Sequence, residues 1–422
     1  MDNKKNVPKI RFPGFTEPWE QRKVLDLLEL LTDYDANGSF ADMAKNINTT
    51  DGDGYAWYVR ITDLENPKPL SELKYVDESS YEFLKKTELH GGELLMAKRG
   101  NIGKVYIFEP RTKYATVAPN MYLLKLNNKV IPHFLYDYFV SEEGNKKLTR
   151  LNASSTMGAL YKDDVKNIDV IMPSIEEQAM IGNFFQSIDH IITLHQRELD
   201  HTKELKKGLL QKMFPKRGET VPEIRFPGFT EPWEQRKLGE FSEMFNGDRG
   251  INYPKDSDMV PEGIPFINAG DLQNGQVNLK GCNKISREKF NQLGGAKIQR
   301  GDILYCLRGT LGKNAFVDNF DEGTVASSLV DIRPKNIDGT FLFTILNSDI
   351  EYRQRTLNDE GAAQPNLSAK NLADFDIPVP SLEEQEEIGA FFATLDNTIT
   401  LHQRELDHTK ELKKGLLQQM FI

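Results

Sequence analysis

Residues 10–23 read IRFPGFTEPWEQRK, and residues 224–237 repeat those fourteen letters without a change. A longer stretch, ITLHQRELDHTKELKKGLLQKMF at residues 192–214, returns at residues 399–421 with one difference, a glutamine at Gln419 in place of a lysine. A period of about 210 residues is far longer than that of a solenoid or propeller repeat. The chain is therefore a tandem duplication of a domain-sized unit, in the order short block, variable region, helical block.

The composition is that of an ordinary globular protein. The chain has 422 residues, enough for two or three domains that each bury a core, with 39% hydrophobic and 27% charged residues. These values exclude a wholly disordered chain. The net charge of -10 does not indicate a nucleic-acid partner, but such binding depends on where Lys and Arg cluster rather than on their sum.

Cysteine use and hydropathy indicate the compartment. Only two cysteines occur, Cys282 and Cys306, and their spacing suits neither a zinc site nor a disulfide framework. The first residues lack the hydrophobic segment of a signal peptide, and no run of about 18 apolar residues occurs. We therefore expect a soluble protein in a reducing cytoplasm, with no membrane partner.

A long helix is predicted at the end of each half of the duplication. Ser174 with Glu177, and Ser381 with Glu384, fit the S-x-x-E capping box that opens a helix. Apolar residues then follow a three-four alternation, which is typical of a coiled coil. Each helix would extend over about 38 residues, or roughly 57 Å at 1.5 Å per residue. Two such helices in one chain, separated by a folded domain, most simply pack antiparallel.

The residues expected at the helix–helix seam, where the helices meet each other or a partner protein, are apolar. They are Ile181, Phe185, Ile188, Ile192, Leu199 and Leu209 in the first helix, and Ile388, Phe392, Leu395, Ile399, Leu406 and Leu416 in the second. His195 and His402 lie in the same stripe. We interpret them as polar seam residues that fix the register of the pair, rather than as catalytic or metal-binding groups.

The two variable regions, residues 24–173 and 238–380, read as divergent copies of one mixed α/β fold with many turns. Each contains an apolar strand that runs into a glycine-rich basic turn: RGNIGK at residues 99–104 and RGTLGK at residues 308–313. We call these the RG turns. Backbone amides beside their glycines can approach a phosphate, and the Arg and Lys add positive charge. The alternative is a plain tight turn with solvated charges.

Motifs of catalysis are missing from the sequence. A Walker A loop is excluded because two residues, not four, separate the glycines of each RG turn. The chain also lacks G-x-S-x-G, HExxH, G-x-G-x-x-G and the N/D-P-P-Y/F run of an amino-methyltransferase. Glu204 and Lys206 form the E-x-K of some nucleases, but they lie mid-helix, where a solvated helix face explains them better. We therefore predict a chain that is not an enzyme and that holds no cofactor or metal.

Taken together, this layout resembles the specificity (S) subunit of type I restriction-modification systems. The resemblance rests on the FPGFTEPWEQRK openings, on the P-S-x-E-E-Q-x-x-I-G-x-F-F helix starts at residues 173–185 and 380–392, and on the paired LHQRELDHTKELKKGLLQ helices. It covers almost the whole chain. It implies a tandem pseudo-two-fold repeat of two target recognition domains, each reading half of a bipartite, asymmetric site in double-stranded DNA. Two long antiparallel coiled-coil helices would separate the domains.

The resemblance also sets the expected domain bounds and partners. The recognition domains would be residues 1–173 and 215–380, and the helices residues 174–214 and 381–422. The implied protein partners are two methyltransferase subunits, which bind S-adenosylmethionine and methylate adenine, and two restriction and translocase subunits, which use ATP and Mg. The chain would direct adenine methylation and restriction, and so defence against phage, without a cofactor of its own.

The DNA-contacting residues are our own assignment, because the base-reading residues vary within the family that the chain resembles. Basic residues at the RG turns are expected to face phosphate or groove edges: Lys98, Arg99, Lys104, Arg308 and Lys313. Polar residues of the turns and loops suit base edges: Arg60, Thr62, Asn101, Asn120, Ser155 and Thr156 in the first domain, and Asn268, Thr310, Ser327, Ser328, Gln364 and Asn366 in the second. A solvated loop residue is the alternative at each position.

Two other functions are compatible with the sequence. The first is a coiled-coil adaptor that binds proteins through two similar modules and does not bind nucleic acid. It predicts no salt-dependent DNA binding. The second is a nuclease with an unrecognised site, which predicts activity in the isolated chain. The sequence indicates neither the recognised bases nor the spacer between the half-sites.

Overall fold

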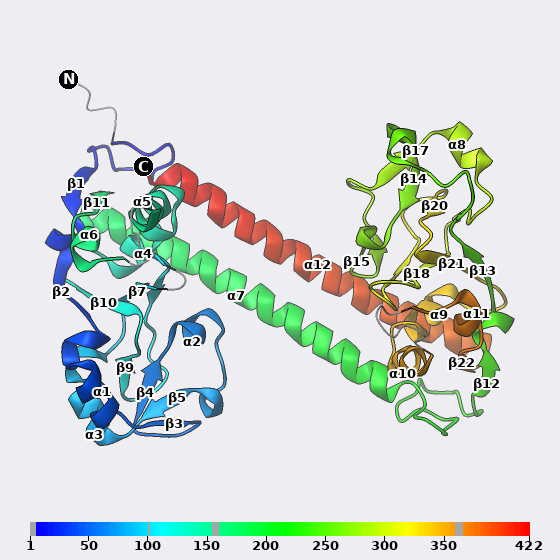
Figure 1. Ribbon diagram of the computed structural model, residues 1–422, viewed down its shortest axis with the longest axis horizontal. Helices are drawn as coiled ribbons and strands as arrows, with labels where there is room; N and C mark the ends of the chain where they lie inside the picture. The colour runs from blue at the N-terminus through cyan, green and yellow to red at the C-terminus, as the bar shows by residue number, and fades with distance from the viewer. Residues whose placement is uncertain (1–5, 100–101, 154–159, 359–365) are drawn as a thin grey trace. The chain divides into compact units, whose positions relative to one another are not determined.

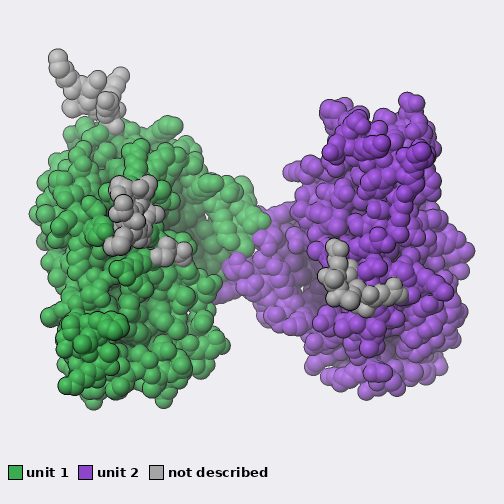
Figure 2. Space-filling view, in the orientation of Figure 1, with its two compact units in different colours: residues 1–194, 405–422 green, residues 195–404 purple. Residues whose placement is uncertain are grey.

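The computed structural model describes residues 6–99, 102–153, 160–358 and 366–422. The chain divides into two compact units, which are coloured separately in Figure 2. Unit 1 consists of residues 1–194 and 405–422, and unit 2 of residues 195–404. Each unit therefore holds one short block, one variable region and part of each long helix.

The two larger β-sheets of unit 1 pack on each other (Figure 1). The first is antiparallel, in the order β2 (Leu28–Asp33), β10 (Met121–Leu126), β7 (Leu94–Ala97), β8 (Val105–Ile107). The second has the order β3 (Thr49–Asp51), β5 (Lys74–Val76), β4 (Ala56–Val59), β9 (Ala115–Val117), β6 (Glu88–Leu89), in which β4 and β9 run parallel. Because side chains alternate along a strand, Leu95 of β7 faces the core between the sheets, whereas Leu94 and Met96 face the core beside helix α4 (Pro132–Val140).

Unit 2 repeats this arrangement with different residues. Its larger sheet has the order β13 (Ser242–Asn246), β21 (Leu329–Pro334), β18 (Ile303–Cys306), β19 (Asn314–Phe316), β16 (Gln276–Val277), β15 (Leu272–Gln273). Its smaller sheet has the order β17 (Asn283–Ile285), β14 (Met259–Ile267), β20 (Thr324–Val325), and β14 and β20 run parallel. The first four strands of the larger sheet match those of unit 1 in order. The variable regions are therefore divergent copies of one fold, as predicted.

Short helices connect the strands. In unit 1 they are α1 (Phe40–Asn46), α2 (Ile61–Glu65), α3 (Glu78–Phe83), α5 (Glu142–Ala153) and α6 (Lys162–Lys166), and in unit 2 they are α8 (Arg287–Gln292), α9 (Gly339–Ile345), α10 (Asp349–Leu357) and α11 (Ala369–Ala373). Helices α4 and α9 are counterparts, because the Gln178 side chain accepts from the Ile131 amide before α4 and the Gln385 side chain accepts from the Asp338 amide before α9, both at 3.0 Å. The mixed α/β class is confirmed.

The short block forms a strand at the edge of each unit. Strand β1 (Glu20–Lys23) pairs antiparallel with β11 (Asp169–Met172), and β12 (Glu234–Lys237) pairs in the same way with β22 (Asp376–Val379). Strands β11 and β22 lead into the long helices α7 (Ile175–Lys212) and α12 (Leu382–Met420). The pairing therefore brings each short block beside the start of a long helix.

An arginine of each short block binds the start of that helix. Arg11 holds the buried carboxylate of Glu177 with two hydrogen bonds of 2.7 and 2.8 Å, and Arg225 holds Glu384 at 2.6 and 2.8 Å. Ser174 Oγ accepts from the Glu177 amide at 3.4 Å, as a cap does. In a capping box the glutamate side chain also accepts from the amide of the serine. That part of the prediction is wrong. The glutamate clamps the short block instead, because a buried carboxylate is best satisfied by a two-pronged guanidinium.

The long helices contain 38 and 39 residues, which confirms that part of the prediction. In unit 1 the start of α7 packs against the end of α12, with Lys413 Nζ 2.6 Å from Asp189 Oδ1. In unit 2 the end of α7 packs against the start of α12, with Lys206 Nζ 2.5 Å from Asp396 Oδ1. Within each unit the two helical segments therefore run antiparallel, as expected.

Many of the predicted seam residues pack into the domains themselves. Three join the core of unit 1 and two join the core of unit 2: Ile181, Phe185, Ile188, Ile388 and Phe392. Two more are buried and five are half-buried: Leu199 and Leu406, then Ile192, Leu209, Leu395, Ile399 and Leu416. The helix starts are thus part of the domain cores, which the heptad pattern alone does not indicate.

The two seam histidines lie close to one carboxylate. The Nδ1 atoms of His195 and His402 are 3.6 and 4.0 Å from Glu198 Oε2. Over the described ranges, no group of three His, Cys, Asp or Glu side chains is arranged to hold a metal ion. The position of both histidines in a half-buried helix seam agrees with a role in register.

The short block also contacts the end of a long helix in each unit. In unit 2 the Ile224 amide donates to the Lys212 carbonyl at 2.9 Å, and in unit 1 the Ile10 amide donates to the Gln419 carbonyl at 3.1 Å. The tryptophan of each block packs edge-on against the phenylalanine that ends the helical block. The two repeated segments therefore meet in both units, which gives a physical reason for their joint identity.

Candidate nucleic-acid interface

The second RG turn links β18 to β19. Both of its glycines have a positive φ, 80° and 85°, a conformation that residues with a Cβ rarely adopt. The Cys306 amide donates to the Lys313 carbonyl at 2.8 Å and closes the turn. Arg308 and Thr310 are exposed on it. The sequence therefore fixes a rigid backbone from which two of the predicted DNA-contacting side chains project.

Two other loops meet this turn. The Asn366 side chain accepts a hydrogen bond from Arg308 Nε at 3.0 Å, and the backbones of these two residues form an isolated bridge. The Ser328 carbonyl accepts from the Leu307 amide at 2.9 Å, and Ser327 precedes it in a half-buried position. Arg308, Ser328 and Asn366, predicted from three separate loops, thus lie together.

Two predicted residues of this domain donate hydrogen bonds to backbone carbonyls of the same domain. The Lys313 ammonium donates to the Ala269 carbonyl at 2.8 Å, and the Asn268 side chain donates to the Phe266 carbonyl at 3.3 Å. The Lys313 contact ties the loop after β14 to the RG turn, and the Asn268 contact is local to the end of β14. Both side chains position the interface in this structure, and neither projects freely from it.

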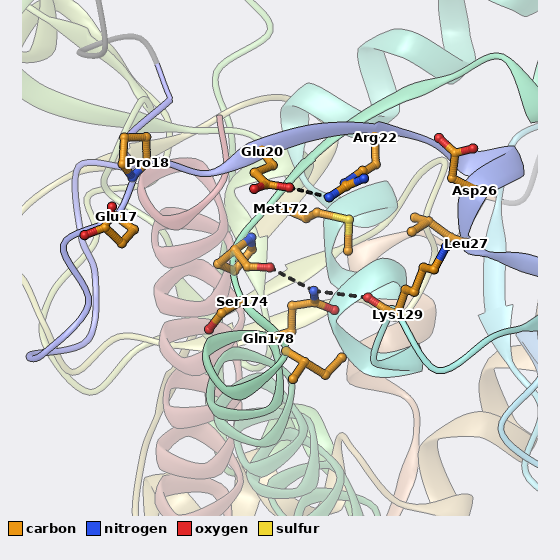
Figure 3. Close-up of a pocket in the computed structure, with 12 residues that line it drawn as sticks. Glu17, Pro18, Glu20, Arg22, Asp26, Leu27, Lys129, Met172, Ser174 and Gln178 are labelled. Carbon is orange, nitrogen blue, oxygen red and sulfur yellow. Dashed lines mark hydrogen bonds and ion pairs between the residues drawn. The ribbon is translucent and has the colours of Figure 1, made fainter.

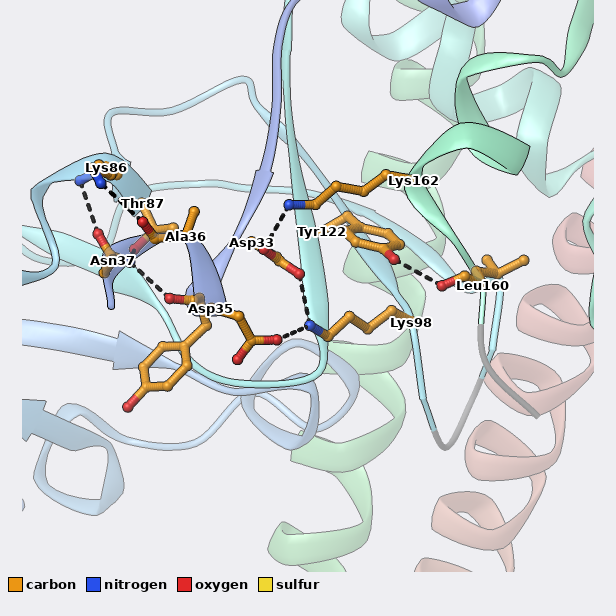
Figure 4. A network of polar contacts seen from close by, with 11 residues as sticks. Asp33, Asp35, Ala36, Asn37, Lys86, Thr87, Lys98, Tyr122, Leu160 and Lys162 are labelled. Carbon is orange, nitrogen blue, oxygen red and sulfur yellow. Dashed lines mark hydrogen bonds and ion pairs between the residues drawn. The ribbon is translucent and has the colours of Figure 1, made fainter. Parts of the chain in front are cut away.

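The first RG turn is anchored by a network of charges (Figure 4). Lys98 Nζ lies 2.7 Å from Asp33 Oδ2 and 2.6 Å from Asp35 Oδ2, and Lys162 Nζ reaches Asp33 Oδ1 at 2.8 Å. Lys98 is only 8% exposed. The expectation that Lys98 faces phosphate is not supported, because two carboxylates already neutralise its charge inside the domain.

The pKa values of this network follow from the same contacts. Burial opposes the charged form of Asp33, but the hydrogen bonds from Lys162 and Lys98 outweigh it and hold the pKa of Asp33 below its usual range. Burial likewise opposes the charged form of Lys98, but its bonds to Asp33 and Asp35 raise the pKa of Lys98. The ion pairs therefore persist at neutral pH and hold the strand ends at the root of the turn.

Other predicted residues of the first domain divide into paired and exposed ones. Arg60 forms two hydrogen bonds with Asp63, of 3.0 and 2.7 Å, at the start of α2, and the largely exposed Lys104 lies 2.7 Å from Glu65 at its end. Three more are exposed: Thr62, Arg99 and Asn120. Three lie outside the described residues, namely Asn101, Ser155 and Thr156, as does Gln364 of the second domain. The exposed set, with Lys104, remains the candidate surface of this domain.

Both variable regions, each with most of its helical block, match a single family. The type I restriction modification DNA specificity domain matches residues 16–204 and again residues 230–411. The chain belongs to this family. The type I restriction enzyme MjaVIII specificity subunit of Methanocaldococcus jannaschii is 23% identical over 77% of this chain and 76% of its own length. The EcoBI specificity subunit of Escherichia coli is 27% identical over 45% of this chain and 41% of its own.

Solved structures share the fold of this specificity-family chain. The S subunit of a type I restriction-modification system from M. genitalium aligns with a TM-score of 0.64 and 16% identity over 99% of both chains. A chain from a study of the assembly and conformational transition of a type I R-M system aligns with a TM-score of 0.51 and 17% identity, over 97% of this chain and 98% of its own. These likenesses support the architecture of two recognition domains and two long helices.

The specificity-family chain has a cavity of about 460 Å³ between the first short block and the start of α7 (Figure 3). Glu20 and Arg22 pair across its rim at 2.5 Å, and the Gln178 side chain donates to the Pro173 carbonyl at 3.0 Å. The described residues that line it include none of the predicted DNA-contacting residues. We assign no ligand to it, because Glu20, Arg22 and Gln178 of its lining are already paired within the protein.

One charged residue beside the second RG turn was not predicted from the sequence. Arg355 of α10 lies against the second glycine of the RG turn, Gly312. The available signal was weak: a Glu and an Arg four residues apart on a predicted helix, which is common on solvated faces. No helix in the described part of the chain has the length and apolarity needed to cross a membrane.

Proposed function

We propose that this chain is the non-catalytic DNA-recognition subunit of a type I restriction-modification complex. Each specificity domain would read one half of a bipartite, asymmetric site in double-stranded DNA. One observation carries the proposal: in unit 2, two other loops with separately predicted residues meet the rigid RG turn, so that Arg308, Ser328 and Asn366 lie together. Such clusters of polar side chains on a fixed backbone suit phosphate and base-edge contacts.

The proposed protein partners are methyltransferase subunits and, through them, restriction and translocase subunits. S-adenosylmethionine, ATP and Mg would belong to those partners. The predicted docking residues of the seam are mostly covered, so a different set of the same helices is favoured. Leu194 and Leu205 of α7 and their repeats Leu401 and Leu412 of α12 are each between 42% and 56% exposed. The same pair of leucines, eleven residues apart on each helix, offers two equivalent apolar surfaces.

The test of the proposal is the pattern of DNA methylation in cells. Sequencing of methylated bases in a host with and without this gene should show the loss of one bipartite adenine-methylated motif. Replacing residues 24–173 by the same region of another family member should change one half-site only. The double substitution Leu205→Ser and Leu412→Ser should weaken docking of the methyltransferase subunits, so that a pull-down of the chain no longer recovers them. An unchanged methylome, together with no salt-dependent DNA binding, would favour the protein-binding adaptor.

A further inference from the structure

Helix α10 carries a charged network on the side that faces the second RG turn. Glu351 and Arg355 lie one helical turn apart, and Arg355 Nε donates to Glu351 Oε1 at 2.7 Å. The hydroxyl of Tyr305, on β18, bonds to the same carboxylate oxygen. Tyr305 and Glu351 are buried. Glu351, which is itself held by Tyr305, therefore restricts the conformation of the Arg355 side chain.

The guanidinium lies on the backbone of the turn. A Cβ added to Gly312 would stand 2.5 Å from Nε and 2.8 Å from Cζ of Arg355. The Arg355 side chain also lies over the Tyr352 ring, 5.2 Å from its centroid, and keeps 21% of its surface exposed. The Arg355 guanidinium, paired with Glu351 through Nε, thus presents its other nitrogens beside the turn at a fixed position.

This arrangement leaves hydrogen-bond donors for an outside acceptor. A guanidinium has five N–H donors in a planar fork. Among the described residues, Nε alone of Arg355 forms a hydrogen bond. The two terminal nitrogens therefore remain for a group that comes from outside the domain.

The first domain shows that packing alone does not require a charge here. Leu148 of α5 takes the same place against Gly103, where its Cβ would be 3.1 Å from an added Cβ. Gly144 precedes Leu148 by four residues, at the position that Glu351 has in α10, and Met96 replaces Tyr305 on the matching strand. Uncharged residues fill this space in unit 1. Packing therefore does not explain why unit 2 has Glu351 and Arg355 there.

We propose that Arg355 binds a DNA phosphate beside the second RG turn, a contact that the first domain lacks. The proposal rests on the proposed function. A backbone contact is favoured over a base contact, because the tie to Glu351 keeps the side chain from extending into a groove. Exposed Arg308, on the same turn, adds a second positive charge next to the same stretch of backbone.

The test is Arg355→Leu, which installs the residue type of the first domain. It is made in the full chain assembled with its methyltransferase subunits, and binding to cognate and unrelated duplexes is measured over a range of salt. Affinity should fall roughly tenfold on both duplexes, because a charge-assisted hydrogen bond is lost. The slope of log affinity against log salt should drop by about one. Arg355→Lys should keep most of that slope, because the charge remains.

The matched control is Arg353→Leu on the same helix, since Arg353 Nε donates to the Asp349 carbonyl at 3.0 Å within α10. It should change neither quantity. An unchanged salt slope in Arg355→Leu overturns the proposal, as does a loss confined to one base position. A wild-type complex without salt-dependent DNA binding would instead contradict the proposed function. If Arg355→Leu fails to fold, Glu351→Gln with Arg355→Leu removes both charges and permits the same measurement.

Discussion

The two RG turns are closed by equivalent hydrogen bonds, from the Ala97 amide to the Lys104 carbonyl and from the Cys306 amide to the Lys313 carbonyl, but they are supported by side chains of opposite polarity. In unit 1 the residue before the turn is the charged Lys98, and the residue packed on its second glycine is the apolar Leu148. In unit 2 these positions hold the apolar Leu307 and the charged Arg355. The fold thus requires that the space on both sides of the turn be filled, whereas charge is placed independently in each domain.

This difference shows that one fold can place charge in two ways. The cation of unit 1 points inward and stabilises the root of the turn through Asp33 and Asp35. The cation of unit 2 lies at the outer side of the turn, partly exposed. Two domains with the same strand order in their larger sheets can therefore carry differently placed charge beside the same turn.

The largest effect is expected when the first domain receives the arginine of the second. Leu148 is 2% exposed. The residue four positions earlier, where unit 2 has the carboxylate of Glu351, is Gly144, so an arginine at position 148 would have no partner there. Leu148→Arg would bury an unpaired charge, which costs about 3–5 kcal/mol. Chemical unfolding of the full chain should show a transition at clearly lower denaturant. Leu148→Met, of similar volume, should cost less than about 1.5 kcal/mol. Equal stability of the arginine variant would mean that this space is open to water.

A smaller effect is expected from removing the cation of unit 1. Lys98→Met leaves Asp33 with Lys162 alone and should cost about 2 kcal/mol at neutral pH, because a buried charged group loses a partner. The folded-state pKa of Asp33 lies below its unfolded value, so its stabilising contribution is present above about pH 4 and is lost as the pH falls through the folded pKa. The stability gap between wild type and variant should therefore narrow in acid.

The control for that measurement is Leu307→Met in unit 2, at the corresponding position, which should change stability little at any pH. Thermal unfolding at several pH values reports both variants. A gap between wild type and Lys98→Met that stays constant into acid would show that the network does not stabilise the domain through Asp33.

The smallest effect concerns a second polarity difference, between α4 and α9. Asp137 is buried, whereas its counterpart in unit 2 is Thr344. Burial raises the pKa of Asp137 to about 8, although Lys413 opposes the shift. Because the folded-state pKa is raised, the contribution of Asp137 to stability is most favourable below its unfolded pKa of about 4. That contribution is lost as the pH rises towards 8. Asp137→Thr should therefore be more stable relative to wild type at pH 8 than at pH 5. A gain that does not grow with pH would contradict the assignment of the shift.

Local patterns predicted the elements, and long-range contacts decided the roles of side chains. The helix lengths, the Ser174 cap and the positions of the RG turns follow from periodicity and glycine spacing over a few residues. The motif S-x-x-E fits both a capping box and the clamp that Glu177 forms with Arg11, 166 residues away. No neighbouring residue distinguishes the two.

The same limit explains the candidate site. Lys98 reads as one more cation of a basic turn, and its partner Asp33 lies 65 residues earlier in the chain. Arg355 reads as a solvated helix residue, and only the packing of α10 on Gly312 brings it to the turn. The loop positions were predictable because turns are encoded locally. Which of their charges face inward depends on the tertiary fold.

The contact between the first short block and the end of α12 has a consequence for protein synthesis. The core of unit 1 contains Trp19 and Phe421. At about 5–20 residues per second, roughly 20–80 s pass between the synthesis of these two residues. Phe214, the counterpart in unit 2, is made before the aromatic residues that it contacts, Trp233, Phe341 and Phe392. The second domain can thus close as its own helix emerges, whereas the first must remain open, with part of its core uncovered, until residue 421 leaves the ribosome.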